Sequence, residues 1–221
     1  MFDLVLATRN KGKKRELIAL LSDLPFNILS LDDFPKAPEV VEDGATFRSN
    51  AVKKAVEIAK CTGQIAMADD SGIEVDALGG SPGVLSARFA FVGATDKENN
   101  KKLLEMMRVI PEERRGASYR CAIAIATPEG LVDVVEGSCE GRIGFEEKGF
   151  QGFGYDSLFV RLEYNKTFAE LDPSIKNRIS HRARALERAK LILERILSSQ
   201  PPYPPPHPTL SPNRGRGADV S

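Results

Sequence analysis

One stretch in the first half of the chain constrains the fold most, because it joins a short apolar run to two acidic residues and a glycine-rich loop. Residues 65–68 predict a buried strand, which ends at Asp69 and Asp70. We expect Ser71 and Gly72 to form a tight turn after them. Carboxylates at the end of a strand, facing a glycine-rich loop, are a common arrangement for holding Mg²⁺ over phosphates. The alternative is a surface turn in which these four residues only begin a loop.

The composition fits an ordinary globular protein with a sizeable core, since 42% of the 221 residues are hydrophobic and 28% are charged. Lys plus Arg and Asp plus Glu balance at 31 each, so any anion site must be local, and we expect no nucleic-acid partner. No apolar run has the length of a membrane span or the order of a signal peptide, and we expect no membrane partner. The spacing of the cysteines suits neither a metal site nor a disulfide framework and favours a reducing cytoplasm: Cys61, Cys121 and Cys139.

The N-terminal region predicts a strand over 2–7 and a helix over 14–24, joined by a polar connection. Backbone N–H groups at a helix N-terminus suit an anion, but the helix macrodipole disfavours the basic side chains crowded there. A bound phosphate would offset that cost. The alternative is that Asn10 is a plain N-cap and Lys13 a solvated lysine. The connection reads Thr8-Arg9-Asn10-Lys11-Gly12-Lys13, which is not a Walker loop.

The middle of the chain predicts further helices and strands. We expect helices over 46–62, 95–110 and up to about residue 197, and strands over 27–31, 119–127, 131–141 and 157–160. The second and third of these strands flank Pro-Glu-Gly and predict a β-hairpin whose first arm is a central strand. Asn50 and Lys54 lie on one face of their helix. An asparagine inside a helix is mildly unfavourable, and a polar site would explain it.

Two later segments also favour a ligand. Residues 149–156 combine three glycines with three aromatic residues, which would let the backbone approach a flat ligand and a ring stack on a base. The alternative is a flexible loop with incidental aromatics. The chain turns at Asp172-Pro173-Ser174, and a dense polar run over 176–184 then places cations at a helix start, which a bound anion or polar ligand would explain. Residues 200–221 are rich in proline and predict a disordered tail, which leaves 1–199 as the folded domain.

A nucleoside triphosphate is the ligand that uses all of these features. Lysines and Mg²⁺ suit a polyphosphate, and the aromatic loop suits a base. The lack of a Walker loop argues against a motor or GTPase-type enzyme. The sequence shows no nucleophile–base pair of the Ser–His–Asp kind, which favours direct attack by water.

Six motifs, in order over about residues 2–197, resemble the inosine/xanthosine triphosphate pyrophosphatases. The chain departs from the family pattern at Val41, where many members carry a second acidic residue beside the one that matches Glu42. The motifs are Thr8-x-Asn10-x-x-Lys13, Glu42-x-Gly44-x-Thr46-Phe47-x-x-Asn50-Ala51-x-x-Lys54-Ala55, Ala68-Asp69-Asp70-Ser71-Gly72, Gly80-x-Pro82-Gly83-x-x-Ser86-Ala87-Arg88, Gly152-Phe153-Gly154-Tyr155-Asp156 and Ser180-His181-Arg182.

The resemblance implies an elongated, two-lobed α/β fold with a central mixed, twisted sheet flanked by helices and an active-site cleft between the lobes. It implies a homodimer as the usual assembly. The implied activity is Mg²⁺-dependent hydrolysis of ITP, dITP and XTP to the monophosphate and pyrophosphate, which removes deaminated purines from the nucleotide pool.

The same resemblance implies a role for each matching residue. Asp70 would accept a proton from water and, with Glu42, hold the metal ion, while Asp69 would support it. The implied substrate-binding residues are Thr8, Arg9, Asn10, Lys11, Gly12, Lys13 and Lys54 for the phosphates, Ser71, and Phe153, Gly154, Tyr155, Asp156, Lys176, His181 and Arg182 for the base and ribose.

Purine selection then has a physical basis. Hypoxanthine and xanthine carry a 6-oxo acceptor that Arg182 or a backbone N–H can satisfy, whereas the 6-amino group of adenine would face another donor. Such a mismatch in a desolvated pocket discriminates by roughly 10⁴-fold.

Two alternatives remain at this point. A related pyrophosphatase of modified pyrimidine or methylated nucleotides should lack Ser180-His181-Arg182. A nucleotide sensor or RNA-binding protein would not need Asp69-Asp70.

Overall fold

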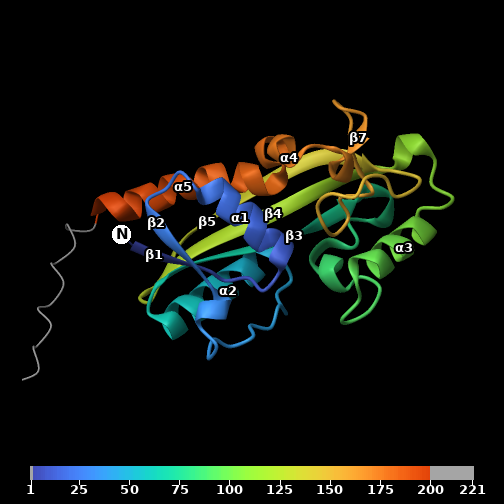
Figure 1. Ribbon diagram of the computed structural model, residues 1–221. Helices are drawn as coiled ribbons and strands as arrows, with labels where there is room; N and C mark the ends of the chain where they lie inside the picture. The colour runs from blue at the N-terminus through green and yellow to red at the C-terminus, as the bar shows by residue number, and fades with distance from the viewer. Residues whose placement is uncertain (1, 200–221) are drawn as a thin grey trace, which may run out of the picture.

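A computed structural model describes residues 2–199, and within them seven strands form one mixed sheet (Figure 1). The predicted disordered tail, 200–221, lies outside the described residues. β1 pairs in parallel with β2 and β3, whereas β3 to β7 pair antiparallel in sequence order. The strands are β1 (Phe2–Leu6), β2 (Phe26–Ser30), β3 (Ile65–Val75), β4 (Gly116–Thr127), β5 (Gly130–Ile143), β6 (Phe159–Arg161) and β7 (Lys166–Thr167).

Helices cover both faces of the sheet, as the α/β expectation requires. α1 and α5 pack on one face, and α2 packs on the other. α3 lies at the far end of the long strands (Figure 1). The helices are α1 (Lys11–Leu21), α2 (Phe47–Thr62), α3 (Asp96–Met106), α4 (Pro173–Ile179) and α5 (His181–Ser199). Within residues 2–199, no helix has both the length and the apolar character needed to span a membrane.

The alternation of side chains along β3 and β4 separates two cores. Met67 and Ile123 face α1 and α5, where leucines and isoleucines fill the space. Ala66, Ala68 and Ala124 face α2, which contributes alanines of its own and therefore packs close to the sheet. The positions of the polar residues on these strands follow from the same alternation.

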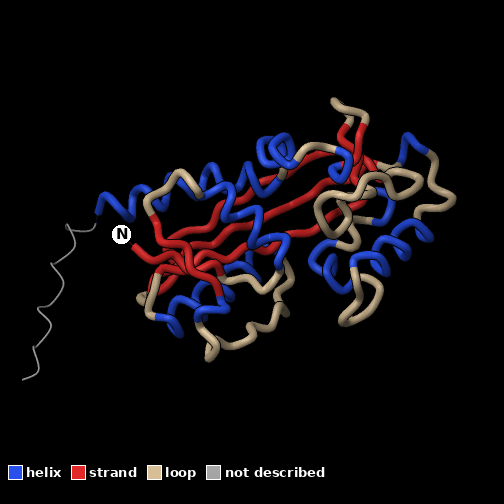
Figure 2. Tube along the Cα trace, in the orientation of Figure 1, coloured by secondary structure: helices blue, strands red, loops and turns tan. Residues whose placement is uncertain are grey.

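The long strands carry the fold from one lobe to the other. β3, β4 and β5 run along the long axis of the molecule (Figure 2). A third core lies at their far end, where residues such as Ile73, Leu103 and Phe159 pack together. The elongated, two-lobed fold implied by the family resemblance is confirmed.

Local sequence signals predicted the ends of several elements correctly. Thr46 and Thr95 are the N-caps of α2 and α3, and both close a capping box with the residue three positions later. Gly63 ends α2 in the left-handed conformation, with φ of 69°. The β4–β5 hairpin and the central place of β4 in the sheet are also as predicted.

Several predicted boundaries were wrong, and three of them bear on the site. β3 does not end before the acidic pair but continues to Val75, because Ser71 and Gly72 pair with β4 instead of turning. α1 begins at Lys11, three residues earlier than predicted, because Asn10 caps it. The C-terminal polar run spans two helices, since Asp172 caps α4 and Ser180 separates α4 from α5.

Candidate active site

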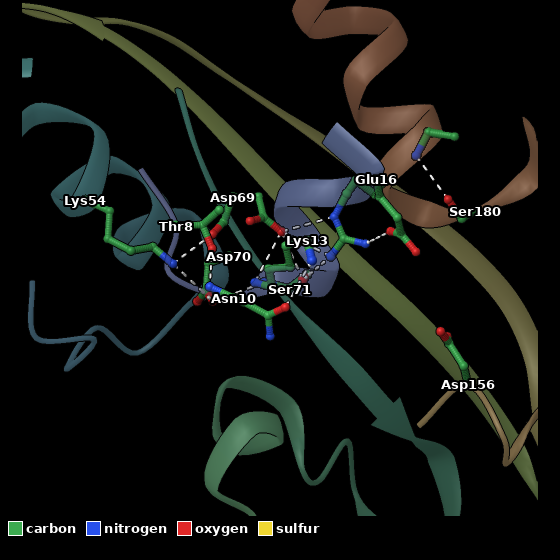
Figure 3. Close-up of polar contacts among 12 residues, drawn as sticks. Thr8, Asn10, Lys13, Glu16, Lys54, Asp69, Asp70, Ser71, Asp156 and Ser180 are labelled. Atoms are coloured by element: carbon green, nitrogen blue, oxygen red, sulfur yellow. Dashed lines mark hydrogen bonds and ion pairs between the residues drawn. The ribbon is translucent and has the colours of Figure 1, made fainter. Parts of the chain in front are cut away.

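Asp69 and Asp70 lie in the middle of β3 and point to opposite faces of the sheet (Figure 3). Both are buried, at 1% and 5% exposure. Asp69 faces α1 and α5, and Asp70 faces α2. The expectation of a carboxylate pair at a strand end is therefore wrong in its geometry, and the two residues have different surroundings and different chemistry.

Asp69 is a buried counter-ion for two cations from distant parts of the chain. Its Oδ2 lies 3.2 Å from Lys13 Nζ and 3.1 Å from Arg182 Nη2, and Ser71 donates to it at 3.2 Å. Burial alone would raise the pKa of Asp69, but the charges of Lys13, Arg182 and Lys54 hold it below its usual range. Asp69 is thus a fixed anion that orients cations and accepts no proton near neutral pH.

Asp70 has the opposite electrostatics. Burial raises the pKa of its carboxyl above the ordinary value, although Lys54 and Lys13 oppose this shift. Asn50 Nδ2 donates to its Oδ2 at 3.0 Å. A fixed carboxylate with a raised pKa is better suited to accepting a proton than an ordinary exposed aspartate.

Glu42 and Asp70 share a cation position. The Lys54 ammonium lies 2.5 Å from Glu42 Oε1 and 3.7 Å from Asp70 Oδ1, and it donates to the backbone carbonyl of Asp69 at 2.7 Å. A divalent ion bound by the same two carboxylates would take the place of this ammonium. Among the described residues, no three His, Cys, Asp or Glu side chains could hold a metal ion by themselves. Two carboxylates with the remaining positions left to water and phosphate are typical of Mg²⁺, so the residues fit that ion.

The β1–α1 connection presents a helix N-terminus to the same cleft. Asn10 Oδ1 accepts from the backbone N–H of Lys13 at 3.0 Å, so the N-cap interpretation of Asn10 is correct. The N–H groups of Lys11 and Gly12, in the first turn, make no backbone hydrogen bond within the helix and can bind an anion. The Lys11 side chain is exposed and lines neither cavity of the site, so only its backbone can take the predicted part.

The aromatic loop closes the other end of the site. Phe153 packs on Gly12, where any side chain would collide with its ring, and Lys176 lies 4.9 Å from the ring centroid. Tyr155 donates to the backbone of Ser86 at 2.8 Å. The Gly154 N–H is bound by Asp96 at 2.6 Å. The loop is therefore anchored to both lobes.

His181 is stacked flat on Tyr119, with ring centroids 4.5 Å apart, and is fully buried. Burial and the nearby Arg182 and Lys176 charges lower the pKa of His181 well below its usual range, so the imidazole is neutral. Its Nδ1 has no hydrogen-bond partner within residues 2–199. A neutral ring with an unpaired polar atom at a pocket is suited to hydrogen-bonding a ligand.

The C-terminal cations are neutralised by the protein itself. Glu16 contacts Lys176 at 2.6 Å and also pairs with Arg182, while Asp156 is hydrogen-bonded to Lys176. Burial would raise the pKa of Glu16, but Arg182 and Lys176 lower it. Because protein carboxylates already balance these cations, a bound anion is not needed for that purpose.

Two cavities meet along this series of charges. A cleft of about 670 Å³ contains Thr8, Arg9, Glu42, Lys54 and Asp70. A narrower pocket of about 80 Å³ contains the aromatic loop, Lys176, His181 and Arg182. Both are lined by four of the same residues: Asn10, Lys13, Ser71 and Ala87. The candidate residues other than Lys11, Gly12 and Asp69 therefore line one continuous, two-part site. Gly12 supports Phe153 from behind, and Asp69 is buried behind the cations that it holds.

Comparisons with known proteins agree with this geometry. The model of the Ham1 family matches residues 4–191. The chain belongs to the Ham1 family. It is 54% identical to a dITP/XTP pyrophosphatase of Desulforamulus reducens, over 89% of this chain and 98% of the relative, and 52% identical to one of Geobacter sulfurreducens, over 86% and 96%.

A solved structure shows the same architecture. A HAM1 protein from Coxiella burnetii, 40% identical to this chain, superposes with a TM-score of 0.79 and covers 88% of this chain and 100% of its own. The identity is high enough for this likeness to reflect common ancestry as well as fold.

Several residues that build this Ham1-family site were not among those predicted. Glu16, Arg88 and Tyr119 contact predicted site residues or line the cleft. Arg88 lies in a quoted motif, and its position there is the signal that could have identified it. Glu16 has no such signal, because a glutamate on a helix is ordinary until the fold brings Lys176 and Arg182 to it.

The neutral state of His181 gives a testable dependence of stability on pH. The unfolded chain protonates this residue below about pH 6.5, whereas the native state does not, so stability is lost as pH falls below that value. We expect His181→Phe, which keeps a ring against Tyr119, to lose about 1.4 kcal/mol less than the wild type per pH unit below 6.5. Urea unfolding at pH 7, 6 and 5 measures the free energy of unfolding of both proteins. An equal loss of this free energy with falling pH in the two proteins would contradict the prediction.

Proposed function

We propose that this protein hydrolyses ITP, dITP and XTP to the monophosphate and pyrophosphate, removing them before they enter DNA or RNA. The observation that carries the proposal is the continuous two-part site, in which Asp70 lies in the larger cleft and the aromatic loop in the narrower pocket. The larger part suits a triphosphate and the smaller a base. The curated relatives named dITP/XTP pyrophosphatase, at 54% and 52% identity, support the same reaction.

The reaction assigns one proton-transfer role. Asp70 accepts a proton from water as the water oxygen bonds to phosphorus and the α–β phosphoanhydride bond breaks, releasing pyrophosphate. Thr8, Lys13 and the first N–H groups of α1 hold the phosphates. We propose Mg²⁺ as the cofactor, held by Glu42 and Asp70, and it would supply Lewis-acid stabilisation of the phosphoryl charge. The ion pairs of Lys13, Lys54, Lys176 and Arg182 with protein carboxylates support this proposal, because a divalent cation would add the positive charge that a triphosphate attracts.

Base selection falls to the narrower pocket. Arg182 donates from Nε to Asp69, from Nη1 to Glu16, and from Nη2 to both Asp69 and Ser71. At most one of its five N–H donors, on Nη1, is therefore left for a 6-oxo group. The pocket is below the roughly 300–1,000 Å³ of typical ligand sites, so base binding widens it. Gly152 and Gly154, with φ of 80° and 61°, flank Phe153 and hold the backbone in conformations that favour glycine.

We also propose that the enzyme is a cytoplasmic homodimer. The family resemblance supports the assembly, and the free thiols Cys61, Cys121 and Cys139 support a reducing compartment. Light scattering coupled to gel filtration tests the assembly, and a monomer at micromolar concentration would refute it.

The products of ITP hydrolysis test the reaction type. We expect IMP and pyrophosphate in equal amounts, detected by ³¹P NMR. IDP and inorganic phosphate would show a terminal phosphohydrolase instead. Performing the reaction in ¹⁸O-labelled water and locating the label would also identify the phosphorus that water attacks.

Removing the Lys13 side chain should weaken substrate binding. Lys13→Ala is expected to raise KM for ITP roughly 10–100-fold, the equivalent of a charge-assisted hydrogen bond of about 1.5–3 kcal/mol. The matched control is Lys14→Ala, because Lys14 pairs with exposed Asp32 at 2.6 Å. Steady-state kinetics measure both variants, and an unchanged KM in Lys13→Ala would refute the phosphate contact.

A further inference from the structure

Asn50 joins two parts of the site that are far apart in the sequence. It is the fourth residue of α2 and is 1% exposed. Its Nδ2 donates to Asp70 Oδ2 at 3.0 Å, and its Oδ1 accepts from the backbone N–H of Gly44 at 2.7 Å. One amide group therefore connects β3 to the loop that carries Glu42.

The loop is held at two backbone points, the carbonyl of Glu42 itself and the N–H of Gly44 two residues later. Arg88 donates to the Glu42 carbonyl at 2.8 Å, and Asn50 binds the N–H of Gly44. A side chain at Gly44 would collide with Ser49 and Asn50, so the close approach of the loop to α2 needs a glycine there. The position of the Glu42 carboxylate is thus set by its backbone neighbours.

Only an amide satisfies both contacts at once. Asp70 as a carboxylate needs a donor, whereas the Gly44 N–H needs an acceptor. Aspartate would offer no donor to Asp70, and leucine of similar size would offer neither group. The mild helix cost of asparagine is therefore offset by two buried hydrogen bonds.

We propose that Asn50 is a positioning residue that fixes the distance between Glu42 and Asp70, so that the two carboxylates meet at one divalent cation. The inference rests on the proposed function, in which these two residues hold Mg²⁺. Asn50 itself touches neither the cation nor the nucleotide. Removing a hydrogen-bond partner that orients a metal-binding carboxylate typically lowers metal affinity or activity by about 10–100-fold.

Direct titration of the protein with Mn²⁺, followed by the EPR signal of free Mn²⁺, tests this without turnover. We expect Asn50→Ala and Asn50→Leu to bind Mn²⁺ roughly 10–100-fold more weakly than the wild type. With Mg²⁺ and ITP, kcat should fall by a similar factor, while KM for ITP changes less than about threefold. Thermal unfolding identifies the temperature range in which each variant is folded, and all titrations are made there.

Lys53→Met is the matched control. Lys53 also connects α2 to the same loop, through an exposed ion pair of 2.8 Å with Asp43, but it contacts neither carboxylate. We expect its Mn²⁺ affinity and kcat to equal those of the wild type. Equal Mn²⁺ affinity in wild type and folded Asn50→Ala would overturn the positioning role and leave the metal proposal standing. Wild-type protein that hydrolyses ITP without binding Mn²⁺ would overturn both and leave the reaction standing.

Discussion

Asp70→Asn is expected to lower kcat for ITP by at least about 10³-fold, because the proton acceptor and a metal-binding carboxylate are lost together. The substitution is nearly isosteric. In the wild type, Asn50 donates to Asp70 at 3.0 Å, and the amide oxygen of the substituted asparagine can accept the same hydrogen bond. The fold should therefore persist, and the loss should be one of chemistry.

The stability of the same variant separates a functional carboxylate from a structural one. Burial disfavours the ionised form of Asp70 and raises its pKa. Replacing the carboxylate by a neutral amide should therefore leave Tm unchanged or higher. Asp32→Asn is the control, since that carboxylate is exposed and pairs with Lys14 at 2.6 Å. Retention of more than a tenth of kcat in Asp70→Asn would remove Asp70 from its role.

Arg182→Leu is expected to destabilise the protein by about 3–5 kcal/mol, the usual cost of removing one partner from a buried ionic group. Arg182 is 1% exposed and pairs with Asp69, at 3.1 Å, and with Glu16. Its loss leaves Asp69 in an ion pair with Lys13, and Glu16 in an ion pair with Lys176. For a chain of this length the predicted fall in Tm is roughly 6–20 °C.

The neighbouring arginine on α5 provides the comparison. Arg184 is exposed and donates to the backbone of Ser138 at 2.9 Å, so Arg184→Leu should change stability by less than about 0.5 kcal/mol. Urea unfolding of the protein free of nucleotide and metal measures both variants. A loss below about 1 kcal/mol in Arg182→Leu would show that the buried carboxylates are satisfied without the guanidinium.

The sequence predicted the elements whose signals are local. Thr46 and Thr95 begin helices because their side chains cap nearby N–H groups, and Gly63 ends one because it adopts a left-handed conformation. The β4–β5 hairpin has a short turn between two strand-like runs. None of these depends on a distant part of the chain.

The arrangement of the site could not be predicted in the same way. Asp69 and Asp70 were expected to act as a pair, but the continuation of β3 through Gly72 turns them to opposite faces. The strand extends because β4 supplies partners for it, which is a tertiary effect. Likewise, Glu16 and Arg182 meet across 166 positions, and no local pattern encodes that contact.

The most direct test of the account is the rate of pyrophosphate release from ITP, XTP, ATP, GTP and dTTP, with Mg²⁺ at neutral to alkaline pH. We predict that kcat/KM for ITP and XTP exceeds that for ATP by roughly 10⁴-fold, because the 6-amino group would leave buried donors unpaired. Equal kcat/KM for all five nucleotides would contradict selection at the narrower pocket. Tight binding of ITP without turnover of any nucleotide would contradict the assignment of an enzyme.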